Sequence, residues 1–477
     1  MACKKKLYLL NPHRQDPPLL LAAQSSRQFE RPVRADAQSL ERNVRQLLAE
    51  KVSGNLLGLW LLVPEHLRLG TWDLLRDWTG ELSPNAVAPR LALHLVHEAA
   101  LCRPSLRYER SLRHKGFELA QGLSFLPSDT AVHDLLDAHT CQDASRLQVR
   151  LGQLRRASGH FSGRVLALDP HRLLSYSQRD MVERRPMASQ SAVKQVQNFF
   201  LLDAQTCQPI CLQHASGALA IPQATAQLLH LARAILPSGP ERPLLVADVE
   251  HYSIEVLDLV RRDGHFDLLV PMRYRPSQLA HYRDIPAEQF TTHWAGFATA
   301  VESFYPTGST LATPCYRYLQ RTGERTQDYH YKAFACTARR PEVPALTRDF
   351  PHRWHIEEFF RFEQSLGWNR AGTLNLNIRL GHMSLALVAQ TVIHQLRRRL
   401  GTPYQQWDSP HLARDFFTGL EGDLRVEGDT LIVTYYNATG AERWKNNFEN
   451  LPALLRREQV DPHIPWLYNF QLDFRFK

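Results

Sequence analysis

The chain has 477 residues, which is too long for one compact core and predicts roughly three or four structural units. Hydrophobic residues make up 44% of the chain and charged residues 22%, as in ordinary folded proteins, which excludes a largely disordered or collagen-like chain. The longest apolar run, Leu56 to Pro64, is far shorter than the roughly 20 residues of a membrane-spanning helix. The apolar run from Leu7 to Leu10 ends too soon for a signal peptide. We therefore expect an intracellular protein with no membrane partner.

The charge distribution is more informative than the formal net charge of +9, which by itself indicates only that a polyanion would be tolerated. Basic residues gather at 103–115, at 146–156, and between Gln364 and Trp407, where no Asp or Glu occurs. Each run alone is typical of a solvated helix face, but three runs of one sign favour a phosphate-binding surface. The candidate DNA contacts in these runs are Arg110, Arg113, Lys115, Arg370, Arg397 and Arg398.

The first third of the chain has a helical pattern after a poorly packed lead-in at 1–37. Apolar residues recur at helix spacing through 38–160. Within this region Gly122 ends one predicted helix, and Ser128 is placed to cap the next. Two short helices around a glycine turn resemble a helix-turn-helix, although any helical bundle contains such a turn. We predict an α-helical N-terminal DNA-binding region here.

The region 161–273 changes period and predicts an α/β core. Strands are predicted at 164–169, 197–203, 209–214, 243–248 and 266–271, with helices at 223–235 and 253–262. The order β-β-β-α-β-α-β begins with antiparallel hairpins and becomes parallel at the helical crossovers. A mixed sheet follows from that order.

The remaining chain predicts three further parts. Residues 274–345 lose the helical signal and are predicted to form an inserted antiparallel β subdomain, with strands at 314–320 and 329–337. Residues 346–401 return to helices, at 353–366 and 377–400, and complete the core. Residues 402–477 carry a predicted hairpin around Gly428 and form a C-terminal region that we connect only with possible synapsis or DNA contacts.

Three acids are the candidate catalytic residues. Asp169 and Asp248 each end a predicted buried strand, where a carboxylate avoids burial by facing a cleft at the edge of the sheet. Glu357 lies on the helix after the insertion, and Glu358 competes with it from about 100° round that helix. An ion-paired surface stripe is the alternative for Glu357. The residues expected on one helical face with it are Phe350, Arg353, Phe360, Arg361 and Gln364.

The combination of two strand-end aspartates, one helical glutamate and a β insertion resembles the RNase H-like DDE transposases. The most similar group is the cut-and-paste insertion sequences with a β-strand insertion and a Tyr-x2-Arg-x3-Glu-x6-Lys signature. Here the frame reads Phe350-x2-Arg353-x3-Glu357-x6-Gln364, so the spacing, arginine and glutamate are kept while both outer residues differ. His171 also stands where many relatives have Thr. The resemblance covers residues from about 164 to 400.

The resemblance implies a DNA transposase that cleaves the ends of an insertion sequence and transfers the 3′ ends into target DNA. Asp169, Asp248 and Glu357 would be the catalytic residues and the ligands of two Mg²⁺ ions, which Mn²⁺ may replace, because phosphodiester chemistry needs charge neutralised on the attacking and leaving oxygens. The expected partner is double-stranded DNA, bound by a homodimer on paired ends, in a prokaryotic, nucleoid-associated cytoplasmic setting.

The DNA contacts implied beside the acids carry their own alternatives. Phe350, Arg353, Arg361 and Gln364 would touch the strand near the cleaved end. Trp294 in the insertion would stack on a flipped base, or else pair with other aromatics to stabilise a small sheet. Two other functions fit the same sequence: a catalytically silent DNA-binding protein of this fold, and an RNase H-like nuclease without strand transfer.

Overall fold

The computed structural model describes residues 35–54, 56–83, 85–103, 115–175, 181, 183–184, 191–216, 219–237, 239–273, 276–369, 373, 375–438 and 440–477. These residues form two compact units. The first unit combines the described residues up to Ser158 with residues 173–175 and Arg361–Lys477. The second unit is a nearly continuous stretch, Gly159–Arg172 with the described residues up to Phe360.

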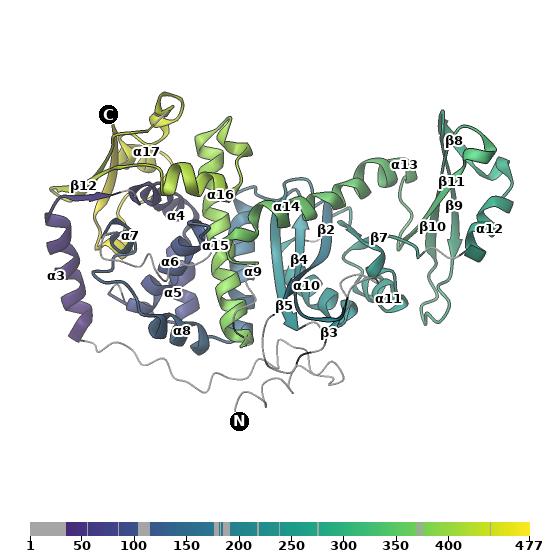
Figure 1. Ribbon diagram of the computed structural model, residues 1–477, viewed down its shortest axis with the longest axis horizontal. Coiled ribbons are helices and arrows are strands. Elements are labelled where there is room, and N and C mark those ends of the chain that lie inside the picture. The colour runs from purple at the N-terminus through teal and green to yellow at the C-terminus, as the bar shows by residue number, and fades with distance from the viewer. Residues whose placement is uncertain are drawn as a thin grey trace. The chain divides into compact units, whose positions relative to one another are not determined.

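The second unit is built on one mixed sheet, to which the described residues contribute ten strands. Along the sheet the strands follow the order β5-β4-β2-β6-β7-β11-β10-β9-β8, with β3 also paired to β4 (Figure 1). The strands are β2 (Val165–Leu174), β3 (Glu183–Arg184), β4 (Val193–Asp203), β5 (Gln208–Ser216), β6 (Leu244–Ala247), β7 (Asp267–Pro271), β8 (Thr291–Trp294), β9 (Phe297–Phe304), β10 (Cys315–Thr322) and β11 (His330–Cys336). The helices are α10 (Ile221–Ile235), α11 (Ile254–Asp263), α12 (Pro276–Asp284), α13 (Glu342–Pro344) and α14 (His355–Glu363).

The strand directions confirm the predicted mixed α/β sheet. Strand β2 pairs in parallel with β6, and β6 pairs in parallel with β7, after the crossover helices α10 and α11. Strand β4 pairs antiparallel with β5. The amide of Ala204, just after β4, donates to the carbonyl of Val165 at the start of β2, so these neighbouring strands run in opposite directions. All four residues of β6 are buried, as expected for a central strand covered on both faces.

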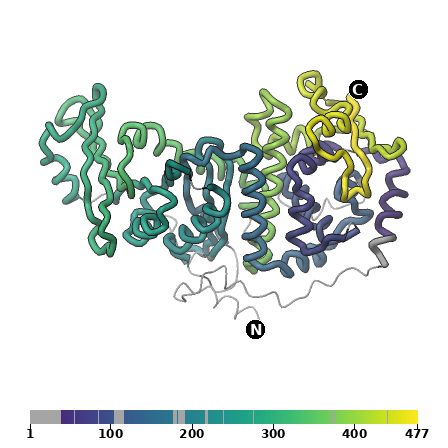
Figure 2. The backbone as a smooth tube through the Cα atoms, turned by 180° about the vertical axis from the view of Figure 1, so that it is seen from behind, coloured from purple at the N-terminus to yellow at the C-terminus, as the bar shows by residue number. Residues whose placement is uncertain are grey.

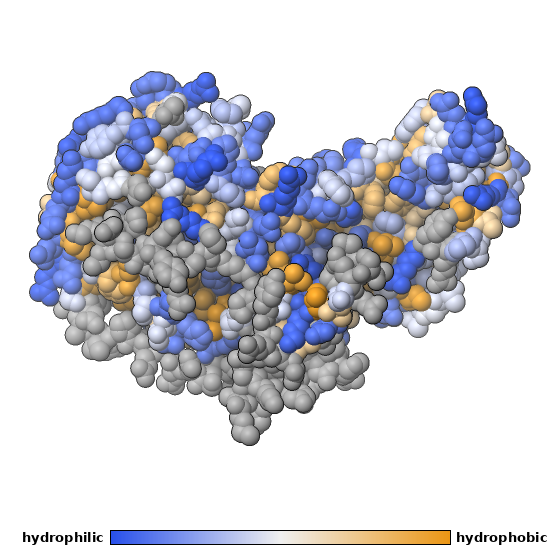
Figure 3. All heavy atoms as spheres, in the orientation of Figure 1, coloured by the Kyte–Doolittle hydropathy of each residue, from blue (hydrophilic) through white to orange (hydrophobic). Residues whose placement is uncertain are grey.

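The inserted subdomain extends the same sheet. Strands β8 to β11 form an antiparallel meander, and β11 joins β7 through three residue pairs, Leu269 with Cys336, Val270 with Ala335 and Pro271 with Phe334. The predicted loss of helical structure in this region is wrong, because α12 packs there, and β8 and β9 were not predicted either. The small apolar core of the subdomain consists of Tyr282, Phe290, Ala298 and Leu319. On the face of the subdomain seen in Figure 3, most surface residues are hydrophilic, and apolar residues are visible between them.

The first unit is mainly helical. Its helices are α3 (Ala35–Ala49), α4 (Val63–Leu69), α5 (Thr71–Thr79), α6 (Val87–Ala100), α7 (Lys115–Ala120), α8 (Asp129–Ala138), α9 (Cys141–Ala157), α15 (Leu376–Leu400), α16 (Ser409–Leu412) and α17 (Leu451–Arg457). Helix α15 is buried along most of its length and packs against α6, α8 and α9; Figure 2 shows it beside α9. Such all-round burial is expected of a central helix. The predicted helix at 377–400 is confirmed.

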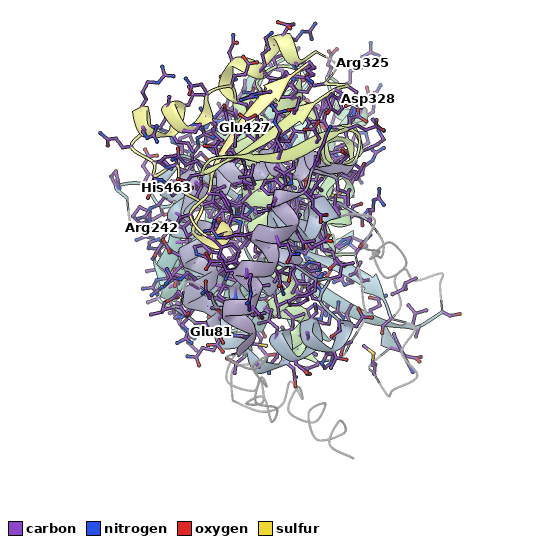
Figure 4. All side chains as sticks on the ribbon, turned by 90° about the vertical axis from the view of Figure 1, so that its left-hand side faces the viewer. Glu81, Arg242, Arg325, Asp328, Glu427 and His463 are labelled. Atoms are coloured by element: carbon purple, nitrogen blue, oxygen red, sulfur yellow. The ribbon has the colours of Figure 1, made fainter. Side chains whose placement is uncertain are left out.

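A second sheet covers part of this helical unit. It has the order β1-β12-β13-β14, formed by β1 (Val52–Gly54), β12 (Gly422–Glu427), β13 (Thr430–Tyr435) and β14 (Gln471–Phe476). The predicted hairpin around Gly428 is present as β12 and β13, while β14 adds in parallel to β13. Glu427, labelled in Figure 4, lies on this hairpin and pairs with Arg475 on β14 at 2.9 Å. The C-terminal residues therefore fold together with the N-terminal helices.

Local sequence signals account for several element boundaries. The Ser128 hydroxyl accepts a hydrogen bond from the Ala131 amide at 3.1 Å, which confirms it as the N-cap of α8. At α9, Thr140 and Asp143 form a reciprocal capping box. None of the helices in the described parts of the chain is both long and apolar enough to span a membrane.

Candidate active site

The register of the central strands places two of the three predicted acids side by side. Leu168 on β2 pairs with Ala247 on β6, and these are the last paired positions of the two strands. Asp169 and Asp248 are the next residues on each. Neighbouring strands lie about 4.8 Å apart, so the two carboxylates emerge together where the parallel pairing stops. Strand β2 continues to Leu174, beyond its predicted end at Asp169.

Asp248 is held in place by the turn that follows β6. It caps the 3₁₀ helix Val249–His251, where its carboxylate accepts a hydrogen bond from the Glu250 amide at 3.0 Å. The buried His251 ring donates through Nδ1 to the same oxygen at 2.9 Å. Burial acts to raise the pKa of Asp248, but the hydrogen bond and charge of His251 outweigh it and hold this pKa below its usual value. Asp248 is therefore a fixed, ionised carboxylate.

Asp169 has the opposite electrostatic character. Burial raises the pKa of Asp169 to about 8, and the neighbouring carboxylates of Asp248, Glu357 and Glu250 act in the same direction, against the opposing charge of Arg353. These interactions also show that the third predicted acid, Glu357, lies in the electrostatic field of Asp169. The three predicted acids are thus gathered at one end of the parallel strands, with Glu250 as a fourth that the sequence analysis missed.

Glu357 occupies the first turn of α14, and its carboxylate accepts from the Arg353 guanidinium, with Nη2 and Oε1 2.9 Å apart. The ion-paired alternative considered for this residue is therefore realised in the structure. Its competitor Glu358 is exposed, and its charge adds to the burial that raises the pKa of the Cys207 thiol. Of the two adjacent glutamates, Glu357 is the one that faces the aspartates.

The single helical face expected from Phe350 to Gln364 is wrong in its geometry. Phe350–Trp354 is a 3₁₀ helix with Pro351 in its first turn, and α14 begins only at His355. Because a 3₁₀ turn has three residues rather than 3.6, the side chains before α14 are rotated from their expected directions. Phe350 consequently packs edge-on against Phe334 of β11, with ring centroids 4.8 Å apart.

Aromatic side chains pack between the strands and the helix that carry the acids. Phe360 stacks on His171 with a centroid separation of 4.5 Å and also meets Phe200 of β4 edge-on. The ring of His171 therefore packs beside the helix that carries Glu357. Phe360, expected on the face of Glu357, is buried instead.

Arg172 and Glu250 are the polar residues near the acids that the sequence analysis missed. The Arg172 guanidinium pairs with the Glu250 carboxylate through both of its terminal nitrogens, one of them 3.0 Å from Oε1. The hydrogen bond and charge of Glu250 raise the pKa of Arg172, and the charges of Asp169 and Asp248 act in the same direction. An acid only two residues after Asp248 was the available sequence signal, but nothing in the sequence linked it to Arg172.

The other predicted DNA contacts have different surroundings. Arg361 and Arg398 are exposed, and Gln364 is half-buried. Arg397 is buried, and its guanidinium donates to Glu363 at 2.8 Å and to Ser409 at 2.6 Å. Its side chain therefore stabilises the fold, and the prediction that it contacts DNA is wrong. The side chains of Arg110, Arg113, Lys115 and Arg370 lie outside the described residues.

Trp294 of the insertion has the surroundings expected of a sheet-stabilising aromatic and is also accessible. Its ring is exposed and stacks flat on Phe297, the first residue of β9, with centroids 4.3 Å apart. The structure is therefore compatible with both functions considered for it.

The predicted helix-turn-helix is covered by the C-terminal segment of its own unit. Helix α7 has only six residues, and its turn at Gly122 adopts a φ of +71°. A Cβ atom there would lie 2.0 Å from the Trp466 carbonyl oxygen, so the close approach also requires glycine. The indole of Trp466 donates to the Ala120 carbonyl at 3.0 Å. The glycine turn is thus a packing site of the helical unit.

The acids have the chemistry of ligands for a hard divalent cation, since carboxylate oxygens are what Mg²⁺ and Mn²⁺ prefer. Burial and the neighbouring carboxylates raise the pKa of Asp169, and a bound cation would act against both causes. Among the described residues, however, no group of three or more His, Cys, Asp or Glu side chains is close enough to hold one ion. As the side chains lie, Glu357 is engaged by Arg353 and Glu250 by Arg172. Carboxylate donors suit such a cation. In the structure, however, two of the four carboxylates are paired with arginines, and no three described side chains surround one ion position.

Comparison with known proteins adds little to this geometry. No protein-family model matches the sequence, and no curated protein matches it. Among solved structures, a chain from the cryo-EM structure of the piggyBac transposase synaptic complex with hairpin DNA is similar. That likeness has a TM-score of 0.36 at 10% sequence identity and covers 77% of this chain and 80% of that chain. A likeness at this level leaves the assignment of function to the residues of the site.

Proposed function

We propose that this chain is a DDE transposase with an RNase H-like core, which cleaves DNA at the ends of an insertion sequence and joins the freed 3′ ends to target DNA. The observation that carries the proposal is the pairing of Leu168 with Ala247, which brings Asp169 and Asp248 together at the end of the parallel strands with Glu357 in their field. The strand order β5-β4-β2-β6-β7 supports the proposed core.

Asp169, Asp248 and Glu357 are the proposed ligands of two divalent ions, Mg²⁺ or Mn²⁺. When bound, such ions neutralise charge on the attacking and leaving oxygens of a phosphodiester. The protein supplies the orientation: the Glu250 amide and His251 fix the Asp248 carboxylate, and burial of Asp169 strengthens its interaction with any cation.

Arg353 is proposed to bind the phosphate beside the scissile bond. Its planar guanidinium offers a forked pair of donors that suits phosphate oxygens, and it already lies within 2.9 Å of the Glu357 carboxylate. If ions bind Glu357, the guanidinium is released toward substrate. Exposed Arg361, Arg398 and Trp294 are proposed as further DNA contacts. The proposed working assembly is a homodimer on paired ends, in a prokaryotic cytoplasm.

The experiment uses duplexes carrying the sequences that flank the coding region in its genome, incubated with the full chain in Mg²⁺, Mn²⁺ or EDTA. Nicked products and joined products in a target plasmid, both dependent on the divalent ion, are expected. Nicking without joining would favour a nuclease. Binding of the duplexes with no nicking in either ion would overturn the proposal in favour of a catalytically silent DNA-binding protein.

A further inference from the structure

The ion pair between Arg172 and Glu250 stands directly beside the proposed catalytic acids. Arg172 lies on β2, three residues after Asp169, and Glu250 lies in the turn that Asp248 caps. Both terminal nitrogens of the guanidinium contact the two carboxylate oxygens, which gives a forked, two-point contact. The Glu250 amide donates to Asp248 at the same time, so the backbone that carries Glu250 is fixed relative to that acid.

A second ion pair involves another of the acids. Arg353 contacts Glu357 through one nitrogen, so each of the two guanidinium groups is paired with one carboxylate of the site. Four carboxylates and two guanidinium groups leave a formal charge of −2 when all are ionised, which one divalent cation would neutralise. Two such cations would reverse the balance to +2 and make the site attractive to a strand of phosphates.

We propose that Arg172 is a phosphate-binding residue for the DNA strand that enters this site, and that Glu250 holds its guanidinium in place until the strand arrives. The inference rests on the proposed function, since it assumes a DNA substrate at the carboxylates. A guanidinium fork fits the oxygens of a phosphate as well as those of a carboxylate, so the phosphate replaces Glu250 at the same donors. Arg172 then binds a phosphate of the same strand that Arg353 orients.

The surroundings of the pair distinguish it from a structural ion pair in the same unit. Arg261 and Asp258 have side chains only 4% and 8% exposed, and Arg261 also bonds to Ser309 and Thr313. By contrast, the side chains of Arg172 and Glu250 are 29% and 40% exposed. Among the described residues, Glu250 is the only hydrogen-bond partner of Arg172. Arg172 is thus reachable from solvent and held at one partner that a phosphate can displace.

The test measures binding of a fluorescent duplex of mixed sequence by anisotropy, in Mg²⁺ and separately in EDTA, over a series of salt concentrations. The full chain is compared with Arg172→Gln, Glu250→Gln and the double variant. The matched controls are Arg233→Gln and Asp263→Asn, because Arg233 and Asp263 form an ion pair of 3.0 Å in the same unit, away from the acids. Melting temperatures of all variants confirm that each is folded.

Arg172→Gln is expected to weaken binding and to reduce the slope of log affinity against log salt by about one, as for the loss of one phosphate contact. Glu250→Gln is expected to tighten binding by about two- to fivefold, since it frees a guanidinium from a partly exposed ion pair. The double variant should lose that gain, because the gain acts through Arg172. Arg172→Lys should keep the salt slope while losing part of the affinity.

Two results would overturn the inference: an Arg172→Gln variant that behaves like Arg233→Gln, or a Glu250→Gln variant that binds no more tightly than Asp263→Asn. Cleavage by the unaltered chain in Mg²⁺ is measured in parallel. If that chain cleaves while Arg172→Gln matches its control, only this inference fails. If it binds DNA but never nicks it, the proposed function fails while the result for Arg172 stands. If it binds no DNA, both fail.

Discussion

The two units differ in how their structures are encoded along the chain. The second unit is nearly continuous in sequence, and its central strands follow each other through short hairpins and helical crossovers. The first unit joins the described residues before Ser158 with those after Arg361. Its α15 packs on α6 and α9, which precede it by more than 200 residues. Strand and helix patterns therefore describe the second unit well and the first only element by element.

The two units also differ in the function of their polar residues. In the second unit the carboxylates of the candidate active site, and the arginines paired with them, gather at one end of the parallel strands, around Asp169 and Asp248. In the first unit the buried polar groups connect distant segments: Arg90 donates to the Trp466 carbonyl at 2.9 Å, and the Tyr435 hydroxyl donates to the Leu57 carbonyl at 2.9 Å. Substitutions in the second unit should thus alter activity most, and substitutions in the first should alter stability most.

The largest effect is expected for the acids of the second unit. Asp248→Asn and Glu357→Gln should each reduce cleavage at least about a thousandfold, since several kcal/mol of charge stabilisation are removed and each 1.4 kcal/mol is tenfold in rate. Glu358→Gln is the matched control for Glu357→Gln and should retain activity. Metal-dependent nicking measures the rates, and a larger loss in Glu358→Gln would transfer the proposed role by one position.

In the first unit, Trp466→Ala should lower the free energy of unfolding by about 3–5 kcal/mol, because the indole is fully buried and donates to Ala120. Trp294→Ala is the matched control in the second unit, where the exposed ring should cost about 1 kcal/mol. Urea unfolding followed by circular dichroism checks both. Equal losses in the two variants would contradict the proposed division between scaffold and site.

A smaller effect is expected for Arg353→Lys, which keeps the charge and loses the fork. Strand cleavage should fall by about 10- to 100-fold while the melting temperature changes little, because a partly exposed ion pair contributes no more than about 1 kcal/mol. Arg348→Lys tests the same substitution at an exposed position just before it, beside Asp349. A loss of stability that explained the whole loss of activity would leave Arg353 with only its ion pair.

The last prediction concerns pH and the stability of the first unit. Burial lowers the pKa of His97 to about 3, and burial together with His97 lowers that of His66 well below its usual value. Both remain neutral in the folded chain, whereas the unfolded chain takes up protons below about pH 6.5. Stability should therefore fall as the pH falls from there toward 3, by up to about 1.4 kcal/mol per pH unit for each histidine.

Urea unfolding between pH 7 and 5 measures this dependence. His97→Gln should flatten it, while the control His133→Gln, at an exposed histidine of α8, should leave it unchanged. An equally steep dependence in His97→Gln would show that other groups control the acid sensitivity of the unit.

The sequence predicted the order of strands and helices along the core and the places of two acids at strand ends, because those features depend on local patterns. Short apolar runs that end in a carboxylate identified Asp169 and Asp248, and a serine before a helix identified the cap at Ser128. The rotation of Phe350 away from Glu357 was not predicted, because the spacing argument assumed 3.6 residues per turn where the chain forms a 3₁₀ helix.

Contacts between distant segments escaped the sequence analysis for a different reason. The pairing of Arg172 with Glu250 depends on β2 and β6 being neighbours, and the parallel addition of β14 to β13 depends on the path of the whole C-terminal region. The partners are 78 residues apart in the first case. The spacing of apolar and polar residues along the chain does not indicate contacts between positions so far apart. The same limit hid the packing of Trp466 on the turn at Gly122.

The divided sequence of the first unit has a consequence for the order in which the protein forms on the ribosome. Domains generally fold as units while synthesis proceeds from the N-terminus. All residues of the second unit have been synthesised once Phe360 has emerged, whereas the first unit still lacks α15, β14 and Trp466. During that interval α6 packs on α5 and α8, and α9 packs on α5, but the faces that α15 covers in the finished unit have no partner. The nascent chain is therefore expected to carry a folded second unit beside incomplete helices, and to be most dependent on chaperones just before its last strand appears.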